Sequence, residues 1–179
     1  MESLQVDYLV KRTGNPSEAE IFQSGRLVAH LVNASQNGQV ISRLKTEDGC
    51  IFELDPRVDG VISPFSFQIY DDGRPVLKIK SGVFSLDGKV YVFKSLPEGV
   101  SMKGHLSGTK SITRLDNFPY KNVDEIDPET RGKLLRYRGI EVGKISGLGT
   151  RGHKVILDEE LSDIGLPLSA ASYLMYSTG

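Results

Sequence analysis

The chain has 179 residues, a net charge of −1 and 39% hydrophobic residues, which predicts one globular domain with its own core. The near-zero charge excludes a strong overall attraction to nucleic acid or to membranes. Cys50 is the single cysteine, so an intramolecular disulfide is excluded, and "MESLQVDYLV" does not resemble a signal peptide. We therefore expect a cytoplasmic protein. The longest apolar-rich stretch, 164–176, is shorter than the roughly 20 residues that a membrane span needs.

The first part of the chain, residues 1–60, reads as strands of less regular pattern than those that follow. Runs such as "GRLVAHLVNA" and "GQVISRLK" are joined by turn residues at 36–38. In "GCIFELD", alternation places Cys50 with Phe52 and Leu54 on one face, which predicts a buried structural cysteine.

The middle of the chain reads as successive hairpins. In "FSFQIYDDGRPVLKIK", Phe65, Phe67 and Ile69 alternate onto one face before the turn residues "DDG". In "GVFSLDGKVYVF", Asp87 and Gly88 separate two β-rich runs, and such a pair is a strong hairpin signal because both residues tolerate positive φ. Turn signals recur every ~8–15 residues up to position 157, as in a sandwich or barrel.

Two stretches depart from this pattern. Residues 116–132 are polar with two prolines and are expected to form a long loop, and long loops are often functional. The C-terminal stretch then predicts a helix with Pro167 in its first turn. Apolar side chains surround that helix, and a helix with no polar face is buried on every side. These side chains are Leu166, Leu168, Ala170, Ala171, Leu174 and Met175.

The strand pairs quoted above, with the later "GIEVGKIS" and the terminal "LPLSAASYLMY", resemble LURP-one-related proteins. The likeness covers about 65–176 and extends to the tubby C-terminal domain and the phospholipid scramblases. It implies a twelve-stranded β-barrel around a central hydrophobic helix. We therefore predict a mostly β, single tubby-like domain over 1–179, an antiparallel barrel in which 158–179 form an acidic turn and the buried helix.

The same resemblance bears on metal binding. Scramblases carry an acidic segment before the helix that is linked to calcium, and the corresponding acids here lie within 158–163. The position after Pro167 and Leu168 is acidic in scramblases but is Ser169 here, so no metal site is predicted. The acids of the 116–132 stretch have cation-binding chemistry as well, but they lack the EF-hand pattern, and a solvated loop is the preferred interpretation.

One glycine pattern suggests a cofactor. "GLGTRG", residues 147–152, matches the dinucleotide fingerprint G-x-G-x-x-G. That fingerprint requires a helix after the glycines, whereas "HKVIL" alternates like a strand. We therefore expect a hairpin loop and neither NAD nor FAD. The chain has no G-x-S-x-G elbow, no Walker A loop and no zinc-ligand spacing, so no catalytic residue is predicted.

Charge is concentrated in one segment. Residues 131–154 carry seven basic residues against Glu141 alone, a net charge of +6. Arg136 and Arg138 are expected on one strand face with Leu134. A patch for an anionic ligand is predicted from five residues: Arg136, Arg138, Lys144, Arg151 and Lys154. The alternative interpretation is a solvated barrel surface whose charges are balanced by neighbouring strands.

These observations favour a non-enzymatic binding module for anionic phospholipid head groups or other phosphorylated ligands, peripheral to a membrane at most. Two alternatives stay open at this point. One is a protein-interaction domain that uses the 116–132 stretch, and the other is an enzyme whose site is assembled from residues far apart in the chain. No specific nucleic acid partner is expected.

Overall fold

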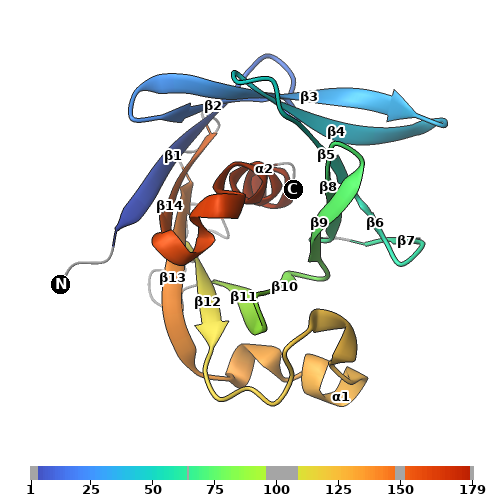
Figure 1. Cartoon of the computed structure of the whole chain (residues 1–179), viewed down its shortest axis with the longest axis vertical. Helices are drawn as coiled ribbons and strands as arrows, with labels where there is room; N and C mark the ends of the chain where they lie inside the picture. Colours follow the sequence, from blue (N-terminus) through green and yellow to red (C-terminus); the bar gives the residue numbers. More distant parts are fainter. Residues whose placement is uncertain (1–3, 64, 96–108, 148–151, 178–179) are drawn as a thin grey trace, which may run out of the picture.

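The computed structural model describes residues 4–63, 65–95, 109–147 and 152–177. Twelve strands form one antiparallel sheet that curls into a nearly closed barrel, which confirms the predicted fold class (Figure 1). In sheet order they are β10 (Val83–Leu86), β11 (Lys89–Ser95), β12 (Lys110–Leu115), β13 (Gly139–Gly147), β14 (Gly152–Asp158), β1 (Gln5–Arg12), β2 (Ala19–Gln23), β3 (Arg26–Gln36), β4 (Gln39–Thr46), β5 (Ile51–Asp55), β8 (Phe67–Asp71) and β9 (Arg74–Ile79). A separate two-stranded hairpin, β6 (Arg57–Val58) and β7 (Val61–Ile62), projects from the wall (Figure 1).

Tight turns set the register of the hairpins. Asp72–Gly73 and Asp87–Gly88 both have positive φ at each position, as a type I′ turn requires. Asn37–Gly38 has the same geometry between β3 and β4. The turns predicted from these residue pairs are therefore confirmed.

Two side chains that alternation predicted as inward-facing are not. Cys50 is exposed, because it lies before β5 in a turn where its amide donates to the Thr46 hydroxyl at 2.9 Å. Phe65 is exposed as well, since its φ is +60° and the extended strand begins only at Phe67. Both predictions were wrong because an alternating sequence pattern can continue past the end of a strand, where side chains no longer alternate between two faces.

The C-terminal helix lies inside the barrel (Figure 1). A 3₁₀ helix, η4 (Glu159–Ile164), leads into α2 (Gly165–Ser177), and Leu168, Ala170 and Ala171 are fully buried. Inward side chains of the surrounding strands form the other part of this core: Val10, Ile21, Leu31, Leu44, Leu54, Ile69, Ile79, Phe84, Ile112, Ile145, Val155 and Leu157. The predicted helix buried on all sides is confirmed.

The hydroxyls of two buried serines in α2 are satisfied within the helix. The hydroxyls of Ser169 and Ser172 donate to the carbonyls of Gly165 and Leu168, four residues earlier, at 2.7 and 2.8 Å. These bonds remove the cost of burying a hydroxyl in an apolar core. Among the described residues, no helix is long and apolar enough to cross a membrane.

The chain between β12 and β13, residues 116–138, packs against the outside of the barrel and is called here the excursion. It contains η1 (Val123–Glu125), α1 (Pro128–Arg131) and η2 (Leu134–Arg136), and the first two lie within the stretch 116–132 that was expected as a long loop. Buried apolar side chains of this excursion and of the barrel wall form a second cluster outside the barrel: Val83, Val90, Val92, Leu115, Val123, Ile126 and Leu134. Because Leu134 packs into this cluster from a 3₁₀ turn, the strand expected around it was wrong.

The excursion also crosses the open seam of the barrel. β9 and β10 end the sheet, and between them the described residues form one isolated bridge, from Lys80 to Val83. Asp124 accepts from Lys78 Nζ on β9 with both carboxylate oxygens at 3.1 Å, and the Val123 amide donates to Ser85 Oγ on β10 at 3.3 Å. η1 thereby ties the two edge strands together.

Removing a large side chain from α2 tests the buried helix. We expect Leu168→Ala to lower the free energy of unfolding by about 2–5 kcal/mol, because it leaves a cavity in a core with no exposed side. Val40→Ala is the matched control, since Val40 is 66% exposed, and it should change the same quantity by less than about 0.5 kcal/mol. Urea unfolding measures both, and equal small effects would contradict the enclosed helix.

Candidate functional site

The predicted anionic patch is divided in the structure. Lys144 and Lys154 lie exposed on neighbouring strands, where Lys144 pairs with Ile156 and Lys154 pairs with Ser146. Arg136 ends η2 and Arg138 directly precedes β13, and both are exposed. Arg151 lies outside the described residues.

These residues make two groups rather than one. Lys144 follows Arg138 by six positions, which along a strand corresponds to about 20 Å at ~3.3 Å per residue. The structure therefore brings Lys144 and Lys154 together, and it separates them from Arg136 and Arg138. A single phosphate cannot contact both groups at once.

A larger cavity lies beside the second group. This cavity, called here the helix-end pocket, has a volume of about 480 Å³. It lies between the wall strands β10 to β12, the excursion and the last turn of α2. Its lining is mostly apolar and comprises Phe65, Ser81, Gly82, Val83, Val92, Phe93, Lys110, Arg131, Gly132, Leu134, Leu135, Met175 and Tyr176.

Aromatic rings form one side of the pocket. The ring of Tyr176 lies 5.8 Å from that of Phe65 and 6.3 Å from that of Phe93, centroid to centroid. Burial raises the pKa of the Tyr176 phenol to about 12, so this group stays protonated at neutral pH. The end of the buried helix thus presents an apolar surface with one hydroxyl.

Two cations line the same pocket. Lys110 Nζ lies 5.5 Å from the centroid of the Tyr176 ring, within the range of a cation–π contact. Arg131 Nη2 donates to the carbonyl of Val123 at 2.8 Å. Arg131 Nη1 is buried and has no hydrogen-bond partner among the described residues. The pocket therefore combines an apolar lining with a guanidinium whose second nitrogen is unused.

The rim of the pocket exposes apolar side chains. Leu135 is 69% exposed and Phe65 is 46% exposed. Phe65 also has the left-handed backbone conformation noted above, which is uncommon for a bulky residue and is often found at functional sites. In the chain, Leu135 stands between the cations Lys133 and Arg136.

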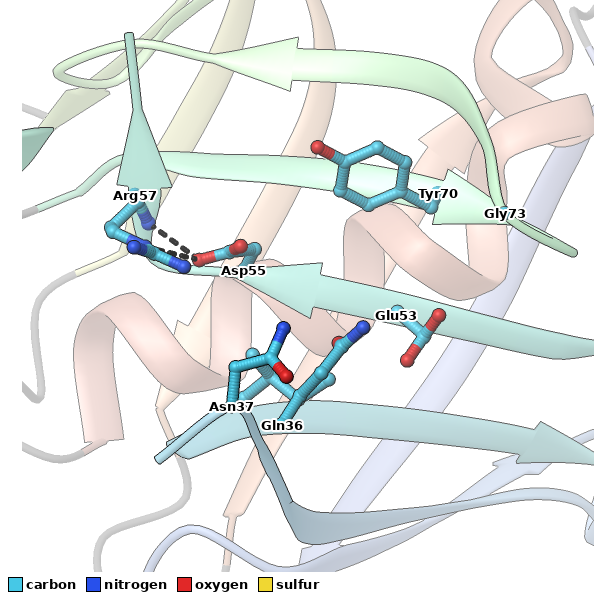
Figure 2. A pocket seen from close by; sticks show the side chains of 8 residues that line it. Gln36, Asn37, Glu53, Asp55, Arg57, Tyr70 and Gly73 are labelled. Atoms are coloured by element: carbon cyan, nitrogen blue, oxygen red, sulfur yellow. Dashed lines mark hydrogen bonds and ion pairs between the residues drawn. The ribbon is translucent and has the colours of Figure 1, made fainter. Parts of the chain in front are cut away.

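A second cavity, of about 220 Å³, lies on the outer surface near the β3–β4 turn. Its acids already have cationic partners, since Glu53 Oε2 lies 3.2 Å from Arg43 Nη2 and Asp55 Oδ1 lies 3.8 Å from Arg57 Nε. Figure 2 shows Asp55 and Arg57 joined, with Glu53 farther along the same wall. The lining of this cavity is more polar than apolar, and the Arg57 guanidinium in it is paired with Asp55.

The acidic stretches are occupied by internal contacts. Glu160 accepts from Arg114 Nη1 at 2.6 Å and from the Tyr91 hydroxyl at 2.8 Å, which fixes η4 to the barrel wall and raises the pKa of Arg114. Asp127 caps α1 by accepting from the Thr130 amide at 2.7 Å. No group of three or more His, Cys, Asp or Glu side chains suited to a metal ion occurs in the described part of the chain.

The two ends of the glycine pattern lie in strands, and residues 148–151 between them lie outside the described residues. Gly147 ends β13 and Gly152 begins β14, and the two strands pair antiparallel. A strand, not a helix, thus follows the glycines, as predicted. Gly152 has φ +136°, and a Cβ there would lie 1.8 Å from the Val10 carbonyl oxygen. Glycine is therefore required at Gly152 by the close approach of β1.

The sequence pointed to Arg136 and Arg138 as candidate residues but did not single out Lys110, Arg131 or Tyr176, which line the pocket. These three lie on β12, α1 and α2, far apart in the chain. Arg131 was visible within the basic segment, whereas the other two carried no local signal. Comparisons with protein-family models, with curated proteins and with solved structures find no significant match.

His153 gives the barrel a pH dependence. It is buried on β14, where its ring packs edge-on against Tyr173 at 5.5 Å, and its Nδ1 has no hydrogen-bond partner among the described residues. Burial lowers the pKa of His153 below its ordinary value of 6.5. The unfolded chain therefore binds a proton at a higher pH than the folded chain does.

We expect the free energy of unfolding to fall as pH drops below about 6.5. Below that pH the unfolded chain binds a proton at His153, whereas the folded chain, in which the pKa of His153 is lower, binds it only at a lower pH. His153→Phe keeps a ring against Tyr173 and should flatten this dependence between about pH 6.5 and about pH 5. His30→Gln, at an exposed histidine, is the control and should leave the fall in place. Urea unfolding across this range would contradict the assignment if His153→Phe left the slope unchanged.

Proposed function

We propose that the protein is a non-enzymatic binding module for anionic lipid head groups, with η2 as the docking segment. The observation that carries this proposal is the exposed Leu135 between cations at the rim of the helix-end pocket. Arg136 and Arg138 follow Leu135, and both are exposed. Apolar side chains flanked by Lys or Arg are typical of segments that rest in a membrane interface.

The chemistry of the flanking residues suits phosphate. An arginine guanidinium offers two parallel N–H donors, which match two oxygens of a phosphate or carboxylate. Lys133 contributes less, because its Nζ lies 3.4 Å from Glu129 Oε1 in an ion pair within the excursion. Arg136 and Arg138 have no ion-pair partner among the described residues, so their charge is available to a ligand.

The other basic group supports binding less well. Lys144 and Lys154 also have no ion-pair partner in the described ranges, but neither lines the helix-end pocket or the second cavity. Their point charges attract anions without holding them in place. The two groups therefore provide a matched comparison within one protein.

We expect Arg136→Glu with Arg138→Glu to weaken association with anionic vesicles by about 30-fold or more, because each basic residue near the surface contributes roughly 1 kcal/mol. Lys144→Glu with Lys154→Glu makes the same charge change and should have a much smaller effect. Sedimentation with vesicles of anionic or neutral lipid measures both variants, and binding of the unchanged protein should fall as salt rises.

The apolar contribution is tested in the same assay. Leu135→Ser should weaken vesicle association, whereas Val40→Ser, at an equally exposed valine on β4, should not. Thermal unfolding should be nearly unchanged for all four variants, since exposed residues contribute little to stability. Equal losses for the two charge reversals, or equal association with neutral and anionic vesicles, would contradict the proposal.

A further inference from the structure

Head-group binding at η2 leaves the depth of the helix-end pocket unexplained. A phosphate needs donors at a surface, whereas this cavity of about 480 Å³ is lined by Val83, Val92, Phe93 and Met175. Pockets of ≈300–1,000 Å³ with an apolar lining and a few polar groups generally enclose a small organic ligand. The volume lies in the lower half of that range, which suits one hydrocarbon chain better than two.

The polar groups of the pocket favour a ligand with a negative charge. The buried Arg131 Nη1 has no hydrogen-bond partner among the described residues, and leaving a buried charged donor unpaired costs free energy. Lys110 adds a second positive charge on the opposite element, β12. An anionic oxygen in the pocket would be attracted by the charges of both Arg131 and Lys110, which a neutral amphiphile is not.

We infer that the helix-end pocket binds a single-chain anionic amphiphile, with its hydrocarbon chain against Val92, Phe93 and Met175 and its acidic group at Arg131 and Lys110. This inference rests on the proposed function and names its ligand class. It also accounts for the exposed apolar side chains of Phe65 and Leu135, which line the same pocket. Alkyl phosphates and fatty carboxylates share the required chemistry.

Calorimetric titration without vesicles tests this inference. Octyl, decyl and dodecyl phosphate are used below their micelle concentrations, with the corresponding carboxylates as the second arm. Each methylene that enters the pocket should tighten binding about fourfold until the chain fills the cavity. Inorganic phosphate should bind far more weakly than dodecyl phosphate, and dodecyl maltoside, which has the chain without the charge, should bind more weakly than both dodecyl acids.

Two variants locate the ligand. Arg131→Gln should weaken dodecyl phosphate binding by roughly 10-fold to 100-fold, the usual range for a charged hydrogen bond, whereas Arg26→Gln, at an exposed arginine on β3 outside the pocket, should leave it unchanged. Met175→Phe adds volume at the pocket wall and should move the best chain length toward shorter chains. Circular dichroism establishes that each variant is folded. The chain-length series on the unchanged protein tests the inference even if a variant does not fold.

The two proposals fail in different ways. Equal affinity for inorganic phosphate and for every chain length, or equal affinity for dodecyl maltoside and dodecyl phosphate, would overturn the inference on the ligand. Vesicle association that does not respond to the Arg136 and Arg138 reversals would overturn the proposed function instead. Because Arg131→Gln is read with soluble amphiphiles and the reversals are read with vesicles, the two failures are distinguishable.

Discussion

A helix without a polar face can be stabilised in water only by enclosure on every side, and the rest of this structure follows from that constraint. α2 has Leu168, Ala170 and Ala171 fully buried, and its serine hydroxyls bond back to its own carbonyls. A flat sheet would cover one side of such a helix. A sheet of twelve strands that curls around it covers nearly all of them (Figure 1). The apolar surface of α2 thus determines that the sheet closes and which residue of each strand faces inward.

Enclosure also explains why the excursion and the pocket lie where they do. The sheet ends at β9 and β10, and η1 ties these edges through Lys78, Asp124 and Ser85. The last turn of α2 meets the same region, so Met175 and Tyr176 line a cavity there, with the Tyr176 ring also beside Phe93 of β11. Arg131 and Lys110 then supply charge from the excursion and from β12. The helix that completes the core therefore also forms one wall of the candidate site.

Much of the fold could be predicted from local sequence. The features that could not be predicted depend on contacts between residues far apart in the chain. Asp87–Gly88 predicted its hairpin because only a few residue pairs tolerate two positive φ values, and the apolar surface of 164–176 predicted a buried helix. Cys50 was misplaced because alternation does not show where a strand begins. Leu134 was expected in a strand because its packing on the outer wall depends on distant valines. The pocket was missed for the same reason, since Lys110, Arg131 and Tyr176 meet only after the barrel forms.

The central claim is that the end of the buried helix forms a wall of a ligand site for an anionic single chain. The most direct measurement is of intermolecular nuclear Overhauser effects between the protein and bound dodecyl phosphate. We expect contacts from the Met175 methyl and from the Val83 and Val92 methyls to the methylenes of the chain, since these side chains line the pocket. Contacts confined to the outer surface of β13 and β14, near Lys144 and Lys154, would contradict the account.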